Sequence, residues 1–453
     1  MHALTSPGRP FKRTRTGCLT CREDGYKCDE QKPFCGRCVR LGKDCKGYGL
    51  KLKWQSPTRP QKAGRDPKEL RRRKVPSTAL TRLRPQLPAA SISPRAMSSG
   101  IPPQQAYLLD HWSTTLASLI TLAPTAQNQF HAHVTPMISH SPSLRSSICF
   151  MAARHLSVLK NDPSLLTTAT QHQTDAVSSL WRTIGTESPL VSLAIIMILH
   201  ITDRLFTTHS GINHLEGAKV IIDRAGTKTW DCSTGTFLLG ICSYHDAVVS
   251  VSRRTPPILA LPDFPYLEGM NPLRGLKILW TTIGQISSMC SQDRSLLDSE
   301  GAAIEIALRT IDTYASREGD GGHTMHAYKE AAYIYLHRVW HNVGSPHPGT
   351  LRHASNCLNH LFQVPVSSTL VSAHPWPLWT AGCETIDSKL RNLVRERIKA
   401  MYESRHLPSL LRLEQDIEYV WKIKDKERTS TGIDKVDCVK AILATRQRGA
   451  DLA

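Results

Sequence analysis

The sequence predicts two parts of different kinds: a small cysteine-rich module with two short helices near the N-terminus and a large all-α body, joined by a basic linker. Six of the thirteen cysteines lie between residues 18 and 45 in a repeated spacing. Residues 1–95 carry 24 Lys and Arg against 7 Asp and Glu (net +17), whereas residues 96–453 carry 33 against 31 (net +2). From about Pro102 the apolar residues recur at helical intervals. A basic end attached to a nearly neutral body indicates a polyanion-binding module on an ordinary globular domain.

The cysteines form an internal repeat, because the pattern Cys-x2-Cys-x6-Cys occurs twice. Two thiolates separated by two residues can bind one cation from the first turn of a helix, and the third thiolate reaches the same site after a short loop. Zinc takes four ligands in tetrahedral geometry, so six cysteines suffice for two zinc ions only if two thiolates are shared. The sequence therefore predicts a site for two zinc ions. The predicted ligands are Cys18, Cys21, Cys28, Cys35, Cys38 and Cys45.

Two other uses of these cysteines are disfavoured. Disulfide bonds suit secreted proteins, but residues 1–17 lack the apolar core of a secretory signal. The seven remaining cysteines, scattered from Cys149 to Cys438, suit a reducing compartment. A double zinc site of the RING or LIM type would need eight ligands including histidine, and no histidine lies between residues 3 and 110.

The sequence words around the cysteines are Arg-Thr-Gly-Cys-Leu-Thr-Cys-Arg (15–22), Lys-Cys-Asp-Glu (27–30) and Lys-Pro-Phe-Cys-Gly-Arg-Cys (32–38). With the cysteine spacing, they resemble the fungal binuclear zinc-cluster transcription factors over about residues 15–48. The resemblance implies that Cys18 and Cys35 bridge the metals and that Pro33 lies in the loop joining the two halves. It also implies that the helix after the first cysteine pair meets the major groove of double-stranded DNA. The expected function is zinc-dependent, sequence-specific regulation of RNA polymerase II genes in the nucleus.

One pair of residues departs from that family's pattern. Its members usually carry two basic residues shortly after the second cysteine, and those residues read the base edges. The matching positions here hold Asp24 and Gly25, and an acidic side chain facing DNA phosphates weakens binding. Gly25 lies four residues after Cys21, as Gly42 lies four after Cys38, so each glycine is expected to end a short helix in a left-handed turn.

We therefore hypothesise that base contacts fall to Arg22 and Lys27, with Tyr26 beside them. Phosphate contacts, which give affinity without sequence information, are expected from Lys12, Arg13, Arg15, Arg37, Arg40 and Lys43. On this hypothesis, Asp24→Lys should tighten DNA binding. The same departure motivates a rival interpretation, in which a zinc-cluster regulator with weakened base readout acts mainly through protein contacts.

The predicted domain order is a basic arm (1–17), the zinc module (18–48), a linker rich in Pro, Ser, Lys and Arg (49–101) and the helical body (102–448). Prolines at this density disfavour a coiled coil directly after the module, so either a monomer or dimerisation through the body is expected. The basic runs Lys12–Arg15 and Arg71–Lys74 suit nuclear import or phosphate contact.

The body is expected to be all-α, with Pro189–Phe206 apolar enough to be central. Gly226 is expected to cap the C-terminus of the helix over 213–225. Its most apolar stretch, Leu190–Leu199, is far shorter than the about 20 residues of a membrane span, so no membrane contact is expected. The predicted helices cover roughly residues 107–120, 143–160, 189–206, 213–225, 235–252, 273–290, 300–316, 325–343, 350–362, 378–404, 408–424 and 434–447. The tryptophans predicted to be packing anchors are Trp112, Trp181, Trp230, Trp280, Trp340, Trp376, Trp379 and Trp421.

Four further words resemble the fungal-specific transcription factor domain over about residues 105–425. In order, they are Gln105–Trp112, Met151–Leu156, His214–Lys219 and Trp376–Glu384. In that family this region is regulatory and sometimes ligand-responsive, which implies co-regulators or a small-molecule effector as partners. Catalysis is not expected: Ser157-x-x-Lys160 fits a hydrolase motif, but the partner motifs are missing from the sequence.

Overall fold

The computed structural model describes residues 17–31, 35–43, 45, 101–122, 128–183, 185–206, 213–259, 274–292, 294–311, 319–431 and 436–445, and the structural statements below concern these residues. The chain forms two compact units, Met1–Lys68 and Glu69–Ala453, which are described separately. Residues 1–16 and 46–100 lie outside the described residues. They include Lys12, Arg13 and Arg15 of the predicted arm, Arg71–Lys74 and almost all of the predicted linker; Pro33 is also outside.

The first unit contains two short helices, α1 (Leu19–Asp24) and α2 (Gly36–Arg40), each preceded by a cysteine. Gly25 ends α1 with φ +78°, and Gly42, with φ +60°, follows the end of α2. Both glycines therefore adopt the left-handed conformation that a residue with a Cβ rarely accepts. The two short helices and their left-handed glycines are as the sequence predicts.

The second unit is helical, and no strand occurs among its described residues. Its first helices are α3 (Pro103–His111), the π-helical η2 (Trp112–Leu116), α4 (Ala117–Leu119), η4 (Phe130–Val134), η5 (Thr135–Ser139), α5 (Pro142–Leu159), α6 (Ser164–Thr183), α7 (Pro189–Phe206), α8 (His214–Ala225), η6 (Thr227–Trp230) and α9 (Ser233–Arg253). They are followed by α10 (Arg274–Met289), α11 (Arg294–Thr310), α12 (Gly319–Trp340), α13 (Pro348–Gln363), η10 (Thr369–Ala373), α14 (Pro375–Gly382), α15 (Ser388–Arg405), α16 (Pro408–Thr431) and α17 (Cys438–Thr445).

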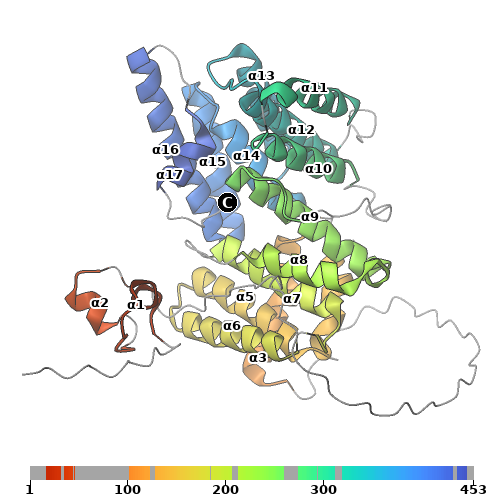
Figure 1. Cartoon of the computed structure of the whole chain (residues 1–453), viewed down its shortest axis with the longest axis vertical. Coiled ribbons are helices and arrows are strands. Elements are labelled where there is room, and N and C mark those ends of the chain that lie inside the picture. The colour runs from red at the N-terminus through yellow and green to blue at the C-terminus, as the bar shows by residue number, and fades with distance from the viewer. Residues whose placement is uncertain are drawn as a thin grey trace, which may run out of the picture. The chain divides into compact units, whose positions relative to one another are not determined.

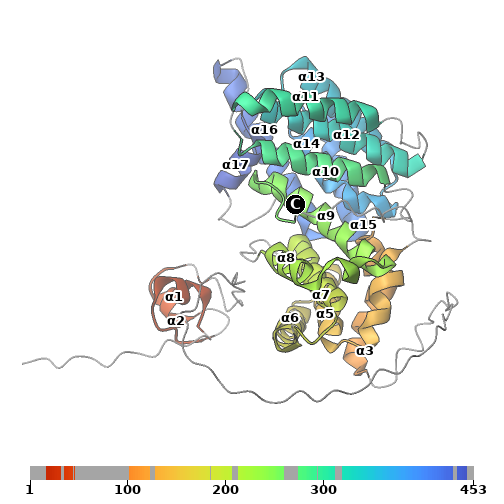
Figure 2. The ribbon, with the colours of Figure 1, turned by 45° about the vertical axis from the view of Figure 1, so that its right-hand side comes forward.

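The helices of this body pack mostly against their neighbours in the chain. At one end α5 packs on α3, α6 and α7; at the other, α12 packs on α10, α11, α13 and α14, and α8 and α9 lie between (Figures 1 and 2). The C-terminal helix α16 contacts α14 and α17 and also returns to α7. Elements from both ends of the body therefore meet around α7.

Helix α7 forms the centre of the body. It has the predicted bounds, Pro189–Phe206, and is buried along almost all of its length after Val191. At 18 residues with a mean hydropathy of 1.6, it is long and apolar enough to cross a membrane by those two criteria. In this structure 72% of it is buried inside the helical body, as in the core helix of a globular domain.

A buried ion cluster joins three of the C-terminal elements. Glu384, 2% exposed, lies between Arg338 of α12 (Nη2 to Oε1, 2.7 Å) and Lys424 of α16 (Nζ to Oε2, 2.5 Å). The backbone amide of Ser345 donates to Glu384 Oε2 at 2.8 Å. Burial alone would raise the pKa of Glu384, but the two cations outweigh it and lower that pKa well below its usual range. Removing the Glu384 carboxylate would take the shared anion from two buried cations, which is strongly destabilising.

Two predictions about the body are wrong. The helix predicted over 378–404 is interrupted, because α14 ends at Gly382 and Asp387 starts α15 by accepting the backbone amide of Leu390 at 2.8 Å. Trp181 is 50% exposed on α6 and therefore is not a packing anchor. Helix α6 itself lies in a stretch where no helix was predicted.

Candidate metal centre and nucleic-acid interface

The six cysteines of the first unit bring their sulfur atoms together in its interior. None of these residues is more than 8% exposed, and all thirteen cysteines of the chain are free thiols. The sulfurs form two groups of four, each with all four Sγ atoms within 4.8 Å of one another. Cys18 and Cys35 belong to both groups. The groups are Cys18, Cys21, Cys28 and Cys35, and Cys18, Cys35, Cys38 and Cys45.

The distances between sulfur atoms fit zinc. Four sulfurs placed tetrahedrally about 2.3 Å from a zinc ion lie about 3.8 Å from one another. Within the two groups, the Sγ atoms of Cys18 and Cys38 are 3.8 Å apart, and those of Cys21 and Cys35 are 3.6 Å apart. A disulfide requires about 2.05 Å, so the sulfurs are spaced as metal ligands.

Backbone amides point at these sulfurs in the same way in both halves of the repeat. The amide of Cys21 donates to Cys18 Sγ (3.4 Å), as that of Cys38 donates to Cys35 Sγ (3.3 Å). The amide of Cys18 donates to Cys28 Sγ (3.3 Å), as that of Cys35 donates to Cys45 Sγ (3.4 Å). Such donors stabilise negative charge on thiolates and orient them toward a metal.

Asp29 connects the two halves through the start of α2. Its carboxylate accepts the backbone amides of Gly36 (Oδ1, 3.0 Å) and Arg37 (Oδ2, 2.7 Å). A Cβ at position 36 would lie 2.8 Å from Asp29 Oδ2, so glycine permits this approach. Burial opposes ionisation of Asp29, but the amides of Gln31, Arg37 and Gly36 outweigh it and lower the pKa. This role could not be predicted from the sequence, because Asp29 lies seven residues before the helix that it caps.

Asp24, the acidic departure from the family pattern, is paired within the module. Its Oδ2 lies 2.6 Å from Lys43 Nζ and 3.6 Å from Arg37 Nη1. The hydrogen bond from Lys43 is the main cause of the lowered pKa of Asp24. Two cations of the second half thus offset the negative charge of Asp24, the residue expected from the sequence to weaken DNA binding.

Arg37, which the sequence predicts to contact phosphate, lies against the first half of the module. Its Nη1 also lies 3.6 Å from Cys21 Sγ, and its guanidinium carbon is 4.2 Å from the centre of the Tyr26 ring. A guanidinium beside a thiolate and over an aromatic face is held by charge and by cation–π attraction. Tyr26 is 65% exposed, and the Arg37 guanidinium packs on one face of its ring.

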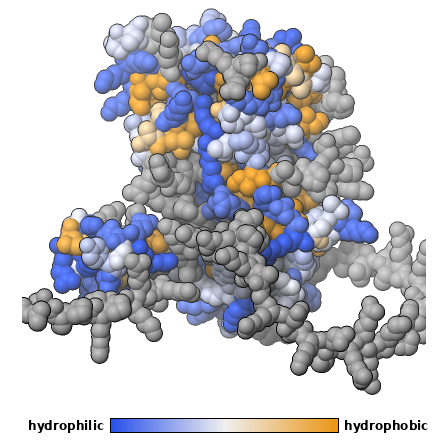
Figure 3. Space-filling model, in the orientation of Figure 1, coloured by the Kyte–Doolittle hydropathy of each residue, from blue (hydrophilic) through white to orange (hydrophobic). Residues whose placement is uncertain are grey.

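Three of the predicted DNA-contacting residues stay at the surface of the module. Arg22, Lys27 and Arg40 are exposed, and within the described part of the chain Arg22 and Lys27 form no ion pair. Arg40 acts electrostatically on Asp29. The face of the module seen in Figure 3 is mainly hydrophilic, with a smaller hydrophobic area. Unpaired cations on a compact core suit contact with a polyanion.

The helical body offers no comparable metal centre in its described residues. Among all described residues of the chain, the only close groups of metal-ligating side chains are the two cysteine groups of the first unit. The ring nitrogens of His133 lie 3.0 Å from Thr234 Oγ1 and from Gln129 Oε1. Ser157 Oγ donates to the carbonyl of Arg154 within its own helix (2.7 Å).

Two family models match the sequence. The fungal specific transcription factor domain matches residues 107–444, and the fungal Zn(2)-Cys(6) binuclear cluster domain matches residues 16–55. The first match covers most of the helical body, and the second contains all six cysteines of the metal centre.

Individual relatives match over short stretches of the chain. Transcriptional regulatory protein moc3 of Schizosaccharomyces pombe is 51% identical over 43 residues, 10% of this chain and 8% of that protein. White-opaque regulator 2 of Candida albicans is 57% identical over 47 residues, 10% of each chain. The aspercryptin biosynthesis cluster-specific transcription regulator atnN of Emericella nidulans is 46% identical over 56 residues, 12% of this chain and 9% of that protein. The matches thus span about a tenth of each relative. No solved structure matches the chain.

Proposed function

The chain belongs to the family of fungal-specific transcription factors that carry a Zn(2)-Cys(6) binuclear cluster, and from this premise we propose that it is a nuclear, sequence-specific regulator of RNA polymerase II genes. The family consists of DNA-binding transcription regulators, which are not enzymes, and its cluster domain binds two zinc ions. The observation that supports sequence-specific readout is the exposure of Arg22 and Lys27, two cations that form no ion pair with the described residues of the module.

The proposed zinc ligands are the six cysteines of the module, with Cys18 and Cys35 bridging the two ions. The two overlapping groups of sulfurs support this assignment. Elemental analysis of the purified full chain should give two zinc ions per chain, and Cys28→Ser should lower that number. Cys232→Ser is the matched control, since Cys232 is an exposed thiol of the body. Zinc content unaffected by Cys28→Ser, or lowered by Cys232→Ser, would contradict the assignment.

For base readout we propose Arg22 and Lys27, with Arg40 and the arm residues Lys12, Arg13 and Arg15 on phosphates. Selection of bound DNA from a random pool by the zinc-loaded full chain should recover a consensus. Arg22→Ala or Lys27→Ala should relax it at particular positions, each contact contributing about 1–3 kcal/mol. Arg40→Ala should weaken binding by a similar factor on all sequences and lower its salt dependence.

The second candidate function is a regulator whose module binds DNA without reading it well and acts through protein contacts. Asp24 and Gly25 motivated this alternative. Gly25 ends α1 and Asp24 is paired with Lys43, so both residues have roles within the module that account for their identity. These roles favour the first candidate. Recovery of no consensus, together with strongly salt-dependent binding to every DNA tested, would favour the second.

A further inference from the structure

The helical body contains two adjoining cavities whose walls combine apolar and basic side chains. Counting the open solvent at their mouths, they span about 580 and about 750 Å³. The residues that line both cavities, and so form the wall between them, are Ile120, Leu122, Ile201, Tyr244 and His245. The two cavities therefore adjoin along these residues.

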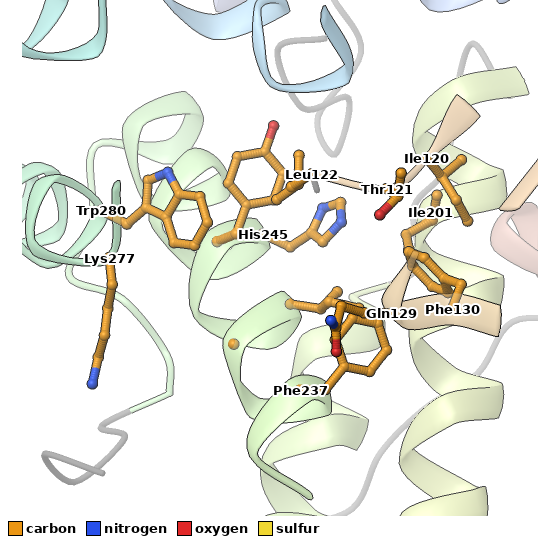
Figure 4. Close-up of a pocket in the computed structure, with 13 residues that line it drawn as sticks. Ile120, Thr121, Leu122, Gln129, Phe130, Ile201, Phe237, His245, Lys277 and Trp280 are labelled. Atoms are coloured by element: carbon orange, nitrogen blue, oxygen red, sulfur yellow. The ribbon is translucent and has the colours of Figure 1, made fainter. Parts of the chain in front are cut away.

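The first cavity is mainly apolar and aromatic. Phe130 and Phe237 line one side, while Trp280 and His245 come from α10 and α9 on the other (Figure 4). The phenyl rings of Phe130 and Phe237 meet edge to face, with centroids 5.2 Å apart. Lys277 lies along the edge, with its ammonium group turned away from the rings (Figure 4). This space suits the hydrocarbon part of a ligand.

The second cavity brings positive charge to an otherwise apolar space. Arg204 of α7 and Arg405 of α15 line it, beside the hydroxyl-bearing Ser372 and Ser409. Among the described residues that line either cavity, there is no Asp or Glu. The lining therefore favours an anion over a neutral or cationic group.

Arg405 is the strongest indication of the ligand's charge. It is 4% exposed, and its guanidinium donates to two backbone carbonyls, those of Leu119 (Nη1, 3.0 Å) and Ser368 (Nη2, 2.6 Å). Its Nε has no hydrogen-bond partner among the described residues. Burial, helped by the charge of Arg397, lowers the pKa of Arg405 to about 10. A buried cation held only by neutral acceptors is costly, and a carboxylate would satisfy it with charge-assisted hydrogen bonds.

His245 adds an uncharged polar group to the shared wall. Its Nδ1 has no hydrogen-bond partner in the described part of the chain. Burial, and then the charge of Arg204, lowers the pKa of the ring well below its usual value, so the imidazole is neutral near pH 7. A neutral imidazole can donate to or accept from a ligand without adding a charge.

We propose that the two cavities together bind a small carboxylic acid with an apolar body, as a regulatory ligand of this transcription factor. Its carboxylate lies against Arg204 and Arg405, and its hydrocarbon part lies among Phe130, Phe237 and Trp280. The regulatory role rests on the proposed function, whereas the binding itself does not. Because the lining comes from α7, α9, α10 and α15, the ligand links elements from both ends of the body. Binding therefore stabilises their packing against one another.

The first test compares acids with their neutral analogues on the zinc-loaded full chain. The probes are decanoate and 4-phenylbutanoate, each beside the corresponding amide, and binding is followed by tryptophan fluorescence and by the thermal unfolding midpoint. At least one acid should bind about tenfold or more tightly than its amide and raise the midpoint. Equal binding of acid and amide, or no binding by either acid, would overturn the proposal.

A pair of variants at Ser409 tests the charge of the site. Ser409 lines the second cavity, is 6% exposed and lies in the first turn of α16, where the helix dipole tolerates a carboxylate. Ser409→Asp should weaken binding of the acid about tenfold or more, while the nearly isosteric Ser409→Asn should retain it. Acid binding equal in the two variants would count against the proposal, provided that both show similar unfolding midpoints without ligand.

The same protein sample separates this proposal from the proposed function. DNA selection reports on the zinc module, and acid binding reports on the cavities of the body. If an acid binds but no DNA consensus is recovered, the ligand site is supported and its role in gene regulation is contradicted. If a DNA consensus is recovered but no acid binds, the proposed function is supported and the ligand site is contradicted.

Discussion

Lys43 Nζ lies 2.6 Å from Asp24 Oδ2, so a charged pair connects the end of α1 with the residues that follow α2. The pair joins the two halves of the cysteine repeat outside the sulfur cluster. The side chain of Lys43 is 45% exposed, so it could reach a DNA phosphate if it were not paired with Asp24.

The first prediction is that Asp24→Asn tightens DNA binding at low salt. The change removes one negative charge and releases Lys43 for phosphates, so the affinity should rise a few-fold and fall more steeply with salt concentration. The measurement is the Kd for a selected DNA site across a salt series.

Asn is preferred to Lys at this position, because a lysine would face two cations. Asp223→Asn, a change of equal charge on the exposed surface of α8, is the control and should have little effect. Unchanged affinity and salt slope in Asp24→Asn would show that the pair does not limit DNA contact.

The second prediction is that Asp29→Ala weakens zinc binding about 10- to 100-fold, the usual effect of losing a group that supports metal ligands. Asp29 accepts the first two backbone amides of α2, the helix that carries Cys38. Zinc affinity is measured by competition with a chromophoric chelator. Asp29→Asn keeps an acceptor and should retain more of the affinity. A variant Asp29→Ala with unchanged zinc affinity would mean that the metal alone fixes α2.

The third prediction concerns the buried ion cluster. Glu384→Gln removes the carboxylate that lies between the buried Arg338 and Lys424, so the free energy of unfolding should fall by about 3–5 kcal/mol. Urea unfolding followed by tryptophan fluorescence measures it. The control is Glu418→Gln, which breaks a partly exposed pair with Arg395 and should cost about 0–1 kcal/mol. Similar losses in the two variants would show that burial of the Glu384 cluster adds nothing.

The fourth prediction is that the body loses stability on mild acidification. Burial lowers the pKa of His374 from 6.5 to about 3, and that of His111 to about 4. The folded state thus favours the neutral rings, so this stability is complete above pH 6.5 and is lost as pH falls from 6.5 toward the folded pKa. For the fully buried His374 the loss is on the order of a few kcal/mol.

Urea midpoints measured between pH 7.5 and 4.5 test this acid sensitivity. His374→Gln should flatten the decline below pH 6.5, since glutamine does not titrate and can still reach Thr324 Oγ1, which lies 3.0 Å from the His374 ring. The exposed His140 provides the control, and His140→Gln should keep the full decline. A midpoint that stays constant down to pH 4.5 in the unaltered chain would contradict the prediction.

The sequence predicted the parts of the fold that depend on local pattern. The bounds of α7 agree because its apolar run is continuous, and Gly25 and Gly42 adopt left-handed backbone because each follows a short helix. Helix α6 was missed because its buried positions, Ala169, His172, Ala176, Val177 and Leu180, combine small and polar residues with few large apolar ones. The break between α14 and α15 was missed because Asp387 caps a helix inside an otherwise continuous helical pattern.

In the metal centre, the cysteine spacing was sufficient to predict that six thiols gather. The partners of Asp24 and Asp29 were not predictable, since Lys43 and Arg37 come from the other half of the repeat and no spacing rule relates them. The cavities likewise depend on residues far apart in the chain. Leu119 and Arg405, joined by a hydrogen bond, are separated by 286 positions.

The sharing of Cys18 and Cys35 between the two sulfur groups affects how the module responds to zinc supply. The first ion to bind fixes two of the four ligands of the second site, so the second ion binds a site that is already half assembled. Loading is therefore expected to be cooperative, and singly loaded chains should be scarce at every zinc concentration. The fraction of chains able to bind DNA would then rise steeply over a narrow range of free zinc, which makes this regulator dependent on the zinc status of the cell.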